Sequence, residues 1–96
     1  MKLIKVVKSS NKIKKYDAYF LLNDKKTIKK TSFGAAGYSD YTKHNDRERK
    51  KRYLARHVIN EDWNDVTSAG SLSRWILWNK PTLKGSILDF KRKFKL

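Results

Sequence analysis

Residues 16–33 have the sequence YDAYFLLNDKKTIKKTSF, and this stretch decides the fold. In an extended chain successive side chains point to opposite faces, and both faces of residues 16–22 are largely apolar. This pattern predicts a strand in the centre of a sheet. Residues 23–26 (NDKK) then predict a turn, and residues 27–33 return as the second arm of a hairpin. Lys29 and Lys30 in that arm indicate an exposed edge strand.

The segments on either side complete a β-rich part of the chain, residues 1–33. Residues 3–7 are rich in β-branched side chains and are flanked by lysines, which predicts a further short strand. Residues 34–37 (GAAG) are small, and we expect them to end the sheet. Glycine at this place permits a positive φ or a close approach of the backbone to a neighbour.

The remaining part, residues 45–94, has the pattern of helices. Asn45 followed by Glu48 is a capping-box pattern, which predicts a helix from Arg47 to about Ile59. Its first half, residues 47–52 (RERKKR), is polar all round. A turn of this kind cannot be buried, so we expect it to project into solvent or toward a partner.

Two further helices are expected. Ser68 or Thr67 can cap a short helix that runs to Trp78, and the lysine before Pro81 ends it. Thr82 can cap a last helix, in which Leu83, Ile87, Phe90 and Phe94 form one apolar stripe. The sequence therefore predicts a single α+β domain over residues 1–96, with a small antiparallel sheet of about three strands followed by about three helices.

Charge is the unusual property of this chain. Its 96 residues carry 24 Lys and Arg against 9 Asp and Glu, a net charge of +15. Solubility of a small domain needs only about 2–8 charges, so the excess indicates a negatively charged partner. There is no cysteine, which excludes disulfides and thiolate chemistry and suits the reducing interior of a cell. No apolar run approaches the ~18 residues of a membrane span, so we expect no membrane partner.

The positive charge is spread over three segments. Residues 1–32 hold ten lysines and two aspartates, residues 43–56 seven basic and two acidic residues, and residues 80–96 six basic residues and one acidic. A solvated, lysine-rich surface is one reading, and neutralisation of phosphates is the other. The candidate nucleic-acid-binding residues are Arg47, Arg49, Lys50, Lys51, Arg52, Arg56, Lys91, Arg92 and Lys93. Arg49, Arg52 and Arg56 are spaced so that they can share one helix face.

The aromatic residues offer a second kind of contact. Tyr38 and Tyr41 can stack bases of a single strand, although such tyrosines more often pack a loop onto a core. Trp75 and Trp78 are large enough to serve the core or an interface with a partner protein. These four residues are the candidate partner interface.

Catalytic and metal-binding patterns are missing from the sequence. His44 lies before the predicted helix and His57 near its end, and nothing in the sequence marks several carboxylates that converge on one metal site. No nucleophile elbow, phosphate-binding loop or dinucleotide fingerprint occurs. We therefore expect a non-enzymatic protein without a metal or cofactor.

Two runs in particular, residues 33–42 (FGAAGYSDYT) and 73–82 (SRWILWNKPT), carry a resemblance. Over residues 16–94 the chain resembles a family of small basic proteins of uncharacterised function from nucleocytoplasmic large DNA viruses, the giant viruses. The resemblance implies a protein that acts inside the host cell and that can be packaged in the virion. It supplies no catalytic residues.

Two functions follow from this combination. The first is binding of nucleic acid, DNA in preference to RNA, without sequence specificity. The alternative is a minor capsid or virion structural protein that contacts an acidic viral protein. The arginine cluster favours the first and the Trp75/Trp78 segment favours the second, and the sequence leaves the oligomeric state open.

Overall fold

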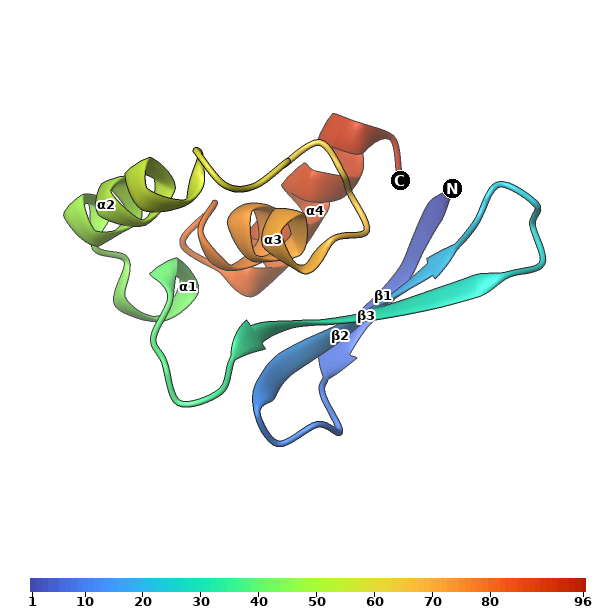
Figure 1. Cartoon of the computed structure of the whole chain (residues 1–96), viewed down its shortest axis with the longest axis horizontal. Coiled ribbons are helices and arrows are strands. Elements are labelled where there is room, and N and C mark those ends of the chain that lie inside the picture. The colour runs from blue at the N-terminus through green and yellow to red at the C-terminus, as the bar shows by residue number, and fades with distance from the viewer.

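Three antiparallel strands form the first third of the chain. In a computed structural model that describes residues 1–96, they are β1 (Lys2–Lys8), β2 (Lys14–Leu21) and β3 (Ile28–Ala35). The strand order is β1-β2-β3, so β2 is central and β3 is an edge strand, as predicted (Figure 1). β2 is paired along both of its edges. Ala18 and Phe20 on one of its faces are buried, whereas Tyr19 and Leu21 on the other face are half-buried.

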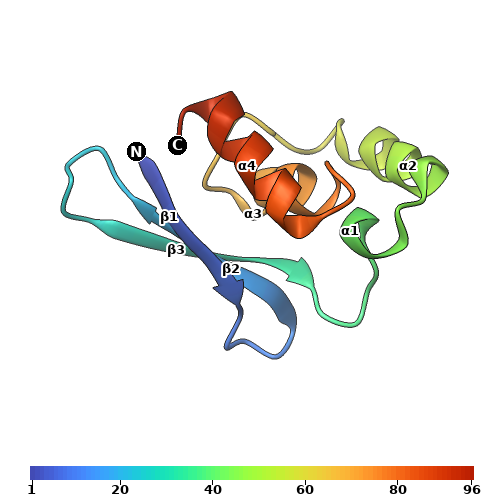
Figure 2. The ribbon, with the colours of Figure 1, turned by 180° about the vertical axis from the view of Figure 1, so that it is seen from behind.

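The helices cover one face of this sheet. They are α1 (Tyr41–His44), α2 (Arg47–His57), α3 (Ala69–Leu72), the π-helix η1 (Ser73–Leu77) and α4 (Leu83–Phe94). Figures 1 and 2 show α3 and α4 packed over the sheet, while α2 lies farther out at one end of the molecule. The predicted α+β architecture is therefore confirmed. None of these helices combines the length and the apolar character that crossing a membrane requires.

The hydrophobic core lies between the sheet and the helices. Each strand contributes to it, and the helical part closes it from the other side. Its fully buried members are Leu3, Ala18, Phe20, Phe33, Leu72, Ile76, Leu77 and Phe90. The alternation of β2 sets this arrangement, since Ala18 and Phe20 are two residues apart and share a face.

The start of α2 at Arg47 agrees with the prediction, but its capping residue differs, and the short helix α1 was not predicted. Asp46 caps α2 in place of Asn45, because its carboxylate accepts hydrogen bonds from the amides of Glu48 and Arg49. Asn45 instead ends α1 in a left-handed conformation, with φ of 52°. The helix α1 itself lies in a segment that has no helical pattern in the sequence. It forms because the Asp40 carboxylate accepts from the amide of Thr42.

Other boundaries agree more closely. Ser68 and Thr82 cap α3 and α4, as predicted, each by accepting a hydrogen bond from an amide in the first turn. The helix α2 ends at His57, two residues before the expected end, and Ile59 beyond it is 83% exposed. Its early end leaves an apolar side chain in solvent.

Gly34 fixes how the sheet meets the helices. The strand β3 continues through Gly34 to Ala35 instead of ending before them. Gly34 has φ of +77°, and a Cβ on it would lie 2.8 Å from Leu77 Cδ1 and 3.2 Å from Lys15 Cβ. Both reasons for a glycine therefore apply at this residue, the positive φ and the close approach.

Candidate functional site

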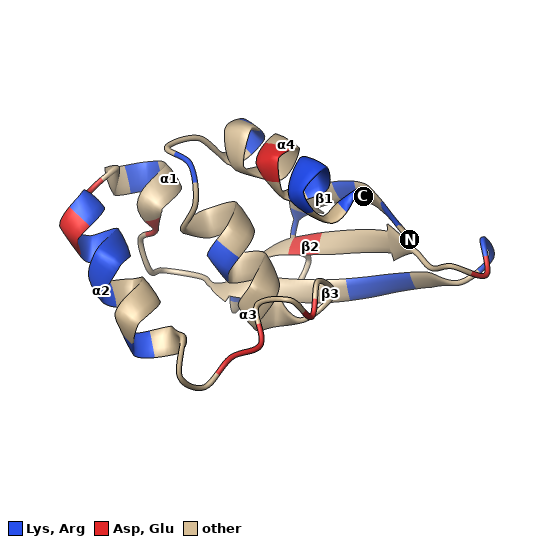
Figure 3. Ribbon diagram, turned by 90° about the horizontal axis from the view of Figure 1, so that it is seen from above, with Lys and Arg blue, Asp and Glu red and all other residues tan.

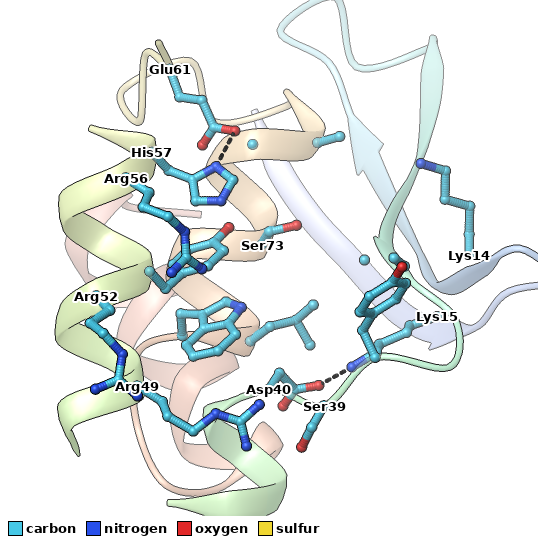
Figure 4. Close-up of a pocket in the computed structure, with 18 residues that line it drawn as sticks. Lys14, Lys15, Ser39, Asp40, Arg49, Arg52, Arg56, His57, Glu61 and Ser73 are labelled. Atoms are coloured by element: carbon cyan, nitrogen blue, oxygen red, sulfur yellow. Dashed lines mark hydrogen bonds and ion pairs between the residues drawn. The ribbon is translucent and has the colours of Figure 1, made fainter. Parts of the chain in front are cut away.

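A cleft of about 650 Å³ lies between α2 and the adjacent end of the sheet. One side is formed by residues of β2, by the end of β3 and by the segment that follows it, and α2 forms the other. The residues of the first side are Lys14, Lys15, Gly34, Ala35, Tyr38, Ser39 and Asp40. Residues of α3 and η1 close the cleft at its base. Figure 4 shows the labelled side chains of α2 on one side of this space and those of Lys14, Lys15 and Asp40 on the other. The cleft therefore depends on segments that are far apart in the sequence.

Three arginines line the α2 side of the cleft. Arg49, Arg52 and Arg56 are exposed, and all three contribute to the same cleft (Figure 4). Their spacing of three and four residues places them on one face of the helix, as the sequence suggested. Lys14 and Lys15 stand opposite them, so basic side chains enter the cleft from both sides.

An aromatic column joins α2 to the base of the cleft. The rings of Tyr53 and Trp78 are stacked, with centroids 4.3 Å apart and 4° between their planes. His57 stacks on the other face of Tyr53 at 4.2 Å, and His44 lies 5.3 Å from the ring of Trp78. Burial in this column raises the pKa of Tyr53 to about 12, and the nearby Glu61 carboxylate adds to the effect.

The π-helix η1 brings Trp78 into this column. The Trp78 amide donates to the carbonyl of Ser73, five residues earlier, at 3.1 Å. A π-turn holds one more residue than an α-turn, and such turns often occur at functional sites. As a result Ser73, Leu77 and Trp78 all line the cleft.

The two carboxylates in the cleft already have partners. Asp40 is buried and forms an ion pair with Lys15 while it caps α1. Glu61 accepts from Trp63 Nε1 at 3.0 Å and lies 3.2 Å from His57 Nδ1. Both carboxylates are thus fixed in place by groups other than the cleft arginines.

Almost all the basic side chains lack an acidic partner within the molecule. The structure contains one ion pair between a lysine and a carboxylate, Lys15–Asp40, and none that involves an arginine. Asp17, Asp24 and Asp46 accept instead from hydroxyl groups or backbone amides, which lowers the pKa of each. The positive charge of the arginines is therefore not neutralised internally.

The remaining basic candidates do not join this cluster. Arg47 and Lys51 are exposed on α2 but do not line the cleft. Lys50 points inward: its ammonium donates to the carbonyl of Asn79 at 2.7 Å and lies 4.8 Å from the centre of the Tyr41 ring. Burial lowers the pKa of Lys50, and the nearby Arg74 contributes. Lys50 thus serves to attach α2 to the rest of the fold.

The α4 candidates lie elsewhere on the surface. Figure 3 shows the basic bands of α2 and α4 at separate places on the molecule. None of Lys91, Arg92 and Lys93 lines the cleft, and the ammonium of Lys93 lies over the ring of Trp75 at 4.8 Å. The sequence-based set of nine basic residues is therefore divided between two surfaces and one internal contact.

The four aromatic candidates also separate. Tyr41 is buried, as expected for a tyrosine that packs a loop, whereas Tyr38 is 73% exposed and lines the cleft. Trp75 is half-buried, and its Nε1 donates to the carbonyl of Trp63 at 3.1 Å. Trp78 is also half-buried, and its ring stacks on Tyr53 within the molecule.

One residue of the cleft and one contact outside it were not found in the sequence. Lys14 reaches the cleft only because the sheet brings β2 opposite α2, and no local pattern marks such a contact. Arg74 lies between the rings of Trp63 and Trp75, 5.4 and 4.2 Å from their centres, and donates to the carbonyl of Trp78. Burial lowers the pKa of Arg74. Its position beside Trp75 in the sequence was the available signal.

No group of three or more His, Asp or Glu side chains is placed to hold a metal ion.

Comparison with known proteins gives one result. Residues 4–57 match the model of the "Family of unknown function (DUF5754)", and this segment contains the three strands, α1 and α2. No match was found among curated proteins or among solved structures.

Proposed function

We propose that this chain, which belongs to the family of unknown function DUF5754, binds nucleic acid through the phosphate backbone without sequence specificity. The observation that carries the proposal is the row of Arg49, Arg52 and Arg56 along the cleft, none of which has an acidic partner.

The chemistry of these side chains fits phosphate. A guanidinium is always charged and offers a planar set of donors that matches two phosphate oxygens at once. Each contact releases counterions from the nucleic acid, which gives affinity without any reading of bases. The net charge is +15 and there is a single lysine–carboxylate pair, so most basic side chains are available for such contacts.

DNA is favoured over RNA as the target. The support is the resemblance of residues 33–42 and 73–82 to proteins of large DNA viruses, whose genome is DNA. Packaging with that genome inside the host cell is part of the same proposal.

The salt dependence of binding tests the proposal. Four cleft cations are free of ion pairs, namely Lys14, Arg49, Arg52 and Arg56. If each contacts one phosphate, log K should fall with log[salt] at a slope of about −3.6 for duplex DNA. Fluorescence anisotropy with two labelled duplexes of unrelated sequence should give the same slope and affinity for both. Binding that does not change with salt would contradict the proposal.

The proposal is for binding without catalysis. Plasmid DNA, single-stranded DNA and RNA incubated with the protein in Mg²⁺, Mn²⁺ or Zn²⁺ should remain intact on a gel. Cleavage that disappears in His57→Ala would instead indicate a hydrolytic site in the cleft.

An acidic protein partner is the second candidate function. It is favoured by Val58 and Ile59, adjacent apolar residues that are 53% and 83% exposed next to the basic helix α2. In a virion structural role, the protein would stay with capsid shells after nuclease and high-salt treatment. Quantitative release together with the DNA would exclude this role.

A further inference from the structure

The size of the cleft bears on which form of nucleic acid it admits. Its volume of about 650 Å³ lies in the range of sites that enclose small molecules, roughly 300–1,000 Å³. A space of this size has room for a nucleotide but not for a double helix, whose phosphates can reach only the rim. Simple attraction of duplex phosphates would need no enclosed space at all.

The interior of the cleft offers more than positive charge. Tyr38, Tyr53, His57 and Trp78 give it aromatic surface, and Ser39 and Ser73 give it hydroxyl groups. The Glu61 carboxylate would repel a phosphate, but it can accept a hydrogen bond from an exocyclic amino group of a base. Each of its oxygens has one partner in the structure and keeps a further lone pair.

Tyr38 is the aromatic residue with a free ring. The faces of Tyr53 are covered by His57 and Trp78, and Trp78 lies between Tyr53 and His44. Tyr38 takes part in no aromatic pair, its hydroxyl has no hydrogen-bond partner, and 73% of it is exposed. It follows Gly37, whose φ of +88° turns the chain after β3.

We propose that the cleft binds an unpaired nucleotide of a nucleic-acid strand, with its phosphate on the α2 arginines and its base against Tyr38. This inference rests on the proposed function and names the form of nucleic acid that the site takes. Basic groups combined with an aromatic platform are the means by which proteins hold single strands without regard to sequence. The protein therefore prefers single-stranded nucleic acid to duplex.

Competition between strand forms tests this inference. A labelled single strand of mixed sequence and the duplex of the same length are titrated by anisotropy at one salt concentration. We expect the single strand to bind about tenfold more tightly. Tyr38→Ala should remove most of this difference by weakening single-strand binding, while Tyr38→Phe, which keeps the ring, should bind like the parent protein. Because 73% of Tyr38 is exposed, neither change should disturb the hydrophobic core.

The other possible results distinguish a failure of this inference from a failure of the proposed function. If both forms bind equally and Tyr38→Ala has no effect, while binding still weakens with salt, this inference is overturned and phosphate binding stands. If the parent protein binds neither the single strand nor the duplex, the proposed function itself is overturned. Displacement of the strand by adenosine monophosphate at micromolar concentration would assign the cleft to free nucleotides. Equal competition by poly-glutamate would show that it recognises negative charge alone, as an acidic protein partner requires.

Discussion

The ring of Trp78 lies parallel to the ring of Tyr53, with 4.3 Å between their centres and 4° between their planes. This contact joins α2 to the end of the π-helix η1, across 24 residues of sequence. Figure 1 shows α2 away from the sheet, so its position depends on contacts with the helices and loops beside it. The stack and the bond from Lys50 to the Asn79 carbonyl are two of the contacts that position α2 and its cleft arginines.

The first prediction concerns this stack. Trp78→Ala should lower the free energy of unfolding by about 3 kcal/mol, because it removes a large ring from between Tyr53 and His44. Urea denaturation followed by circular dichroism measures the change. Tyr38→Ala removes another aromatic ring of the same cleft, but an exposed one, and should change the stability by less than about 0.5 kcal/mol. Equal stability losses for the two variants would contradict the stacked arrangement.

The second prediction concerns alkaline pH. The pKa of Tyr53 rises from 10.0 to about 12 because of burial. The folded state therefore holds this proton more tightly than the unfolded state. The resulting stability is fully present below pH 10 and is lost as the pH rises to about 12, a loss on the order of 3 kcal/mol.

Ultraviolet titration of the five tyrosines measures this effect. One phenol should ionise close to pH 12, and Tyr53→Phe should remove that step. The same variant should also lack the added loss of stability above pH 10. An unchanged late step in Tyr53→Phe would assign it to another tyrosine, with Tyr16 the alternative, because burial also raises the pKa of that residue.

The third prediction compares two glycines with positive φ. Gly34→Ala should destabilise the fold by about 3 kcal/mol, since the new methyl would lie 2.8 Å from Leu77 Cδ1 in addition to the strain of φ at +77°. Gly37→Ala meets only the strain, because no atom lies within 4 Å of its Cβ position, and should cost about 1 kcal/mol. Thermal unfolding of both variants separates the two terms. A larger loss in Gly37→Ala would show that the close approach at Gly34 is not tight.

Structural features that depend on residues close together in the sequence could be predicted, whereas features that depend on distant residues could not. The strands and the caps at Ser68 and Thr82 depend on alternation and on neighbours within three residues, so they could be predicted. The cap at Asp46 could not be distinguished from Asn45, because both types cap helices and the choice depends on the end of α1.

The residues of the candidate site also differ in whether local sequence could predict their positions. The shared face of Arg49, Arg52 and Arg56 is a local property of a helix, and it was predicted. The opposing Lys14 and the inward turn of Lys50 depend on tertiary contacts with α2 and Asn79, for which one sequence contains no signal. Tyr38 and Tyr41 are only three residues apart, yet Tyr38 is exposed and Tyr41 is buried, a difference that depends on the tertiary structure.

The last prediction separates the cleft from the general charge of the protein. Arg49→Ala, Arg52→Ala and Arg56→Ala together remove three charges that line the cleft. The salt slope for duplex DNA should become shallower by about 2.7, and affinity should fall accordingly at low salt. The fold should persist, because these side chains are exposed and form no ion pair, and alanine is a good helix former.

A matched variant makes this test decisive. Lys91→Ala, Arg92→Ala and Lys93→Ala remove the same number of charges from α4, which lies outside the cleft (Figure 3). Because long-range attraction depends on net charge, it should weaken equally in both triple variants, whereas direct phosphate contacts should be lost only in the α2 variant. The salt slope of the α4 variant should therefore match that of the parent protein. Equal slopes for the two variants would place binding on the whole basic surface and not in the cleft.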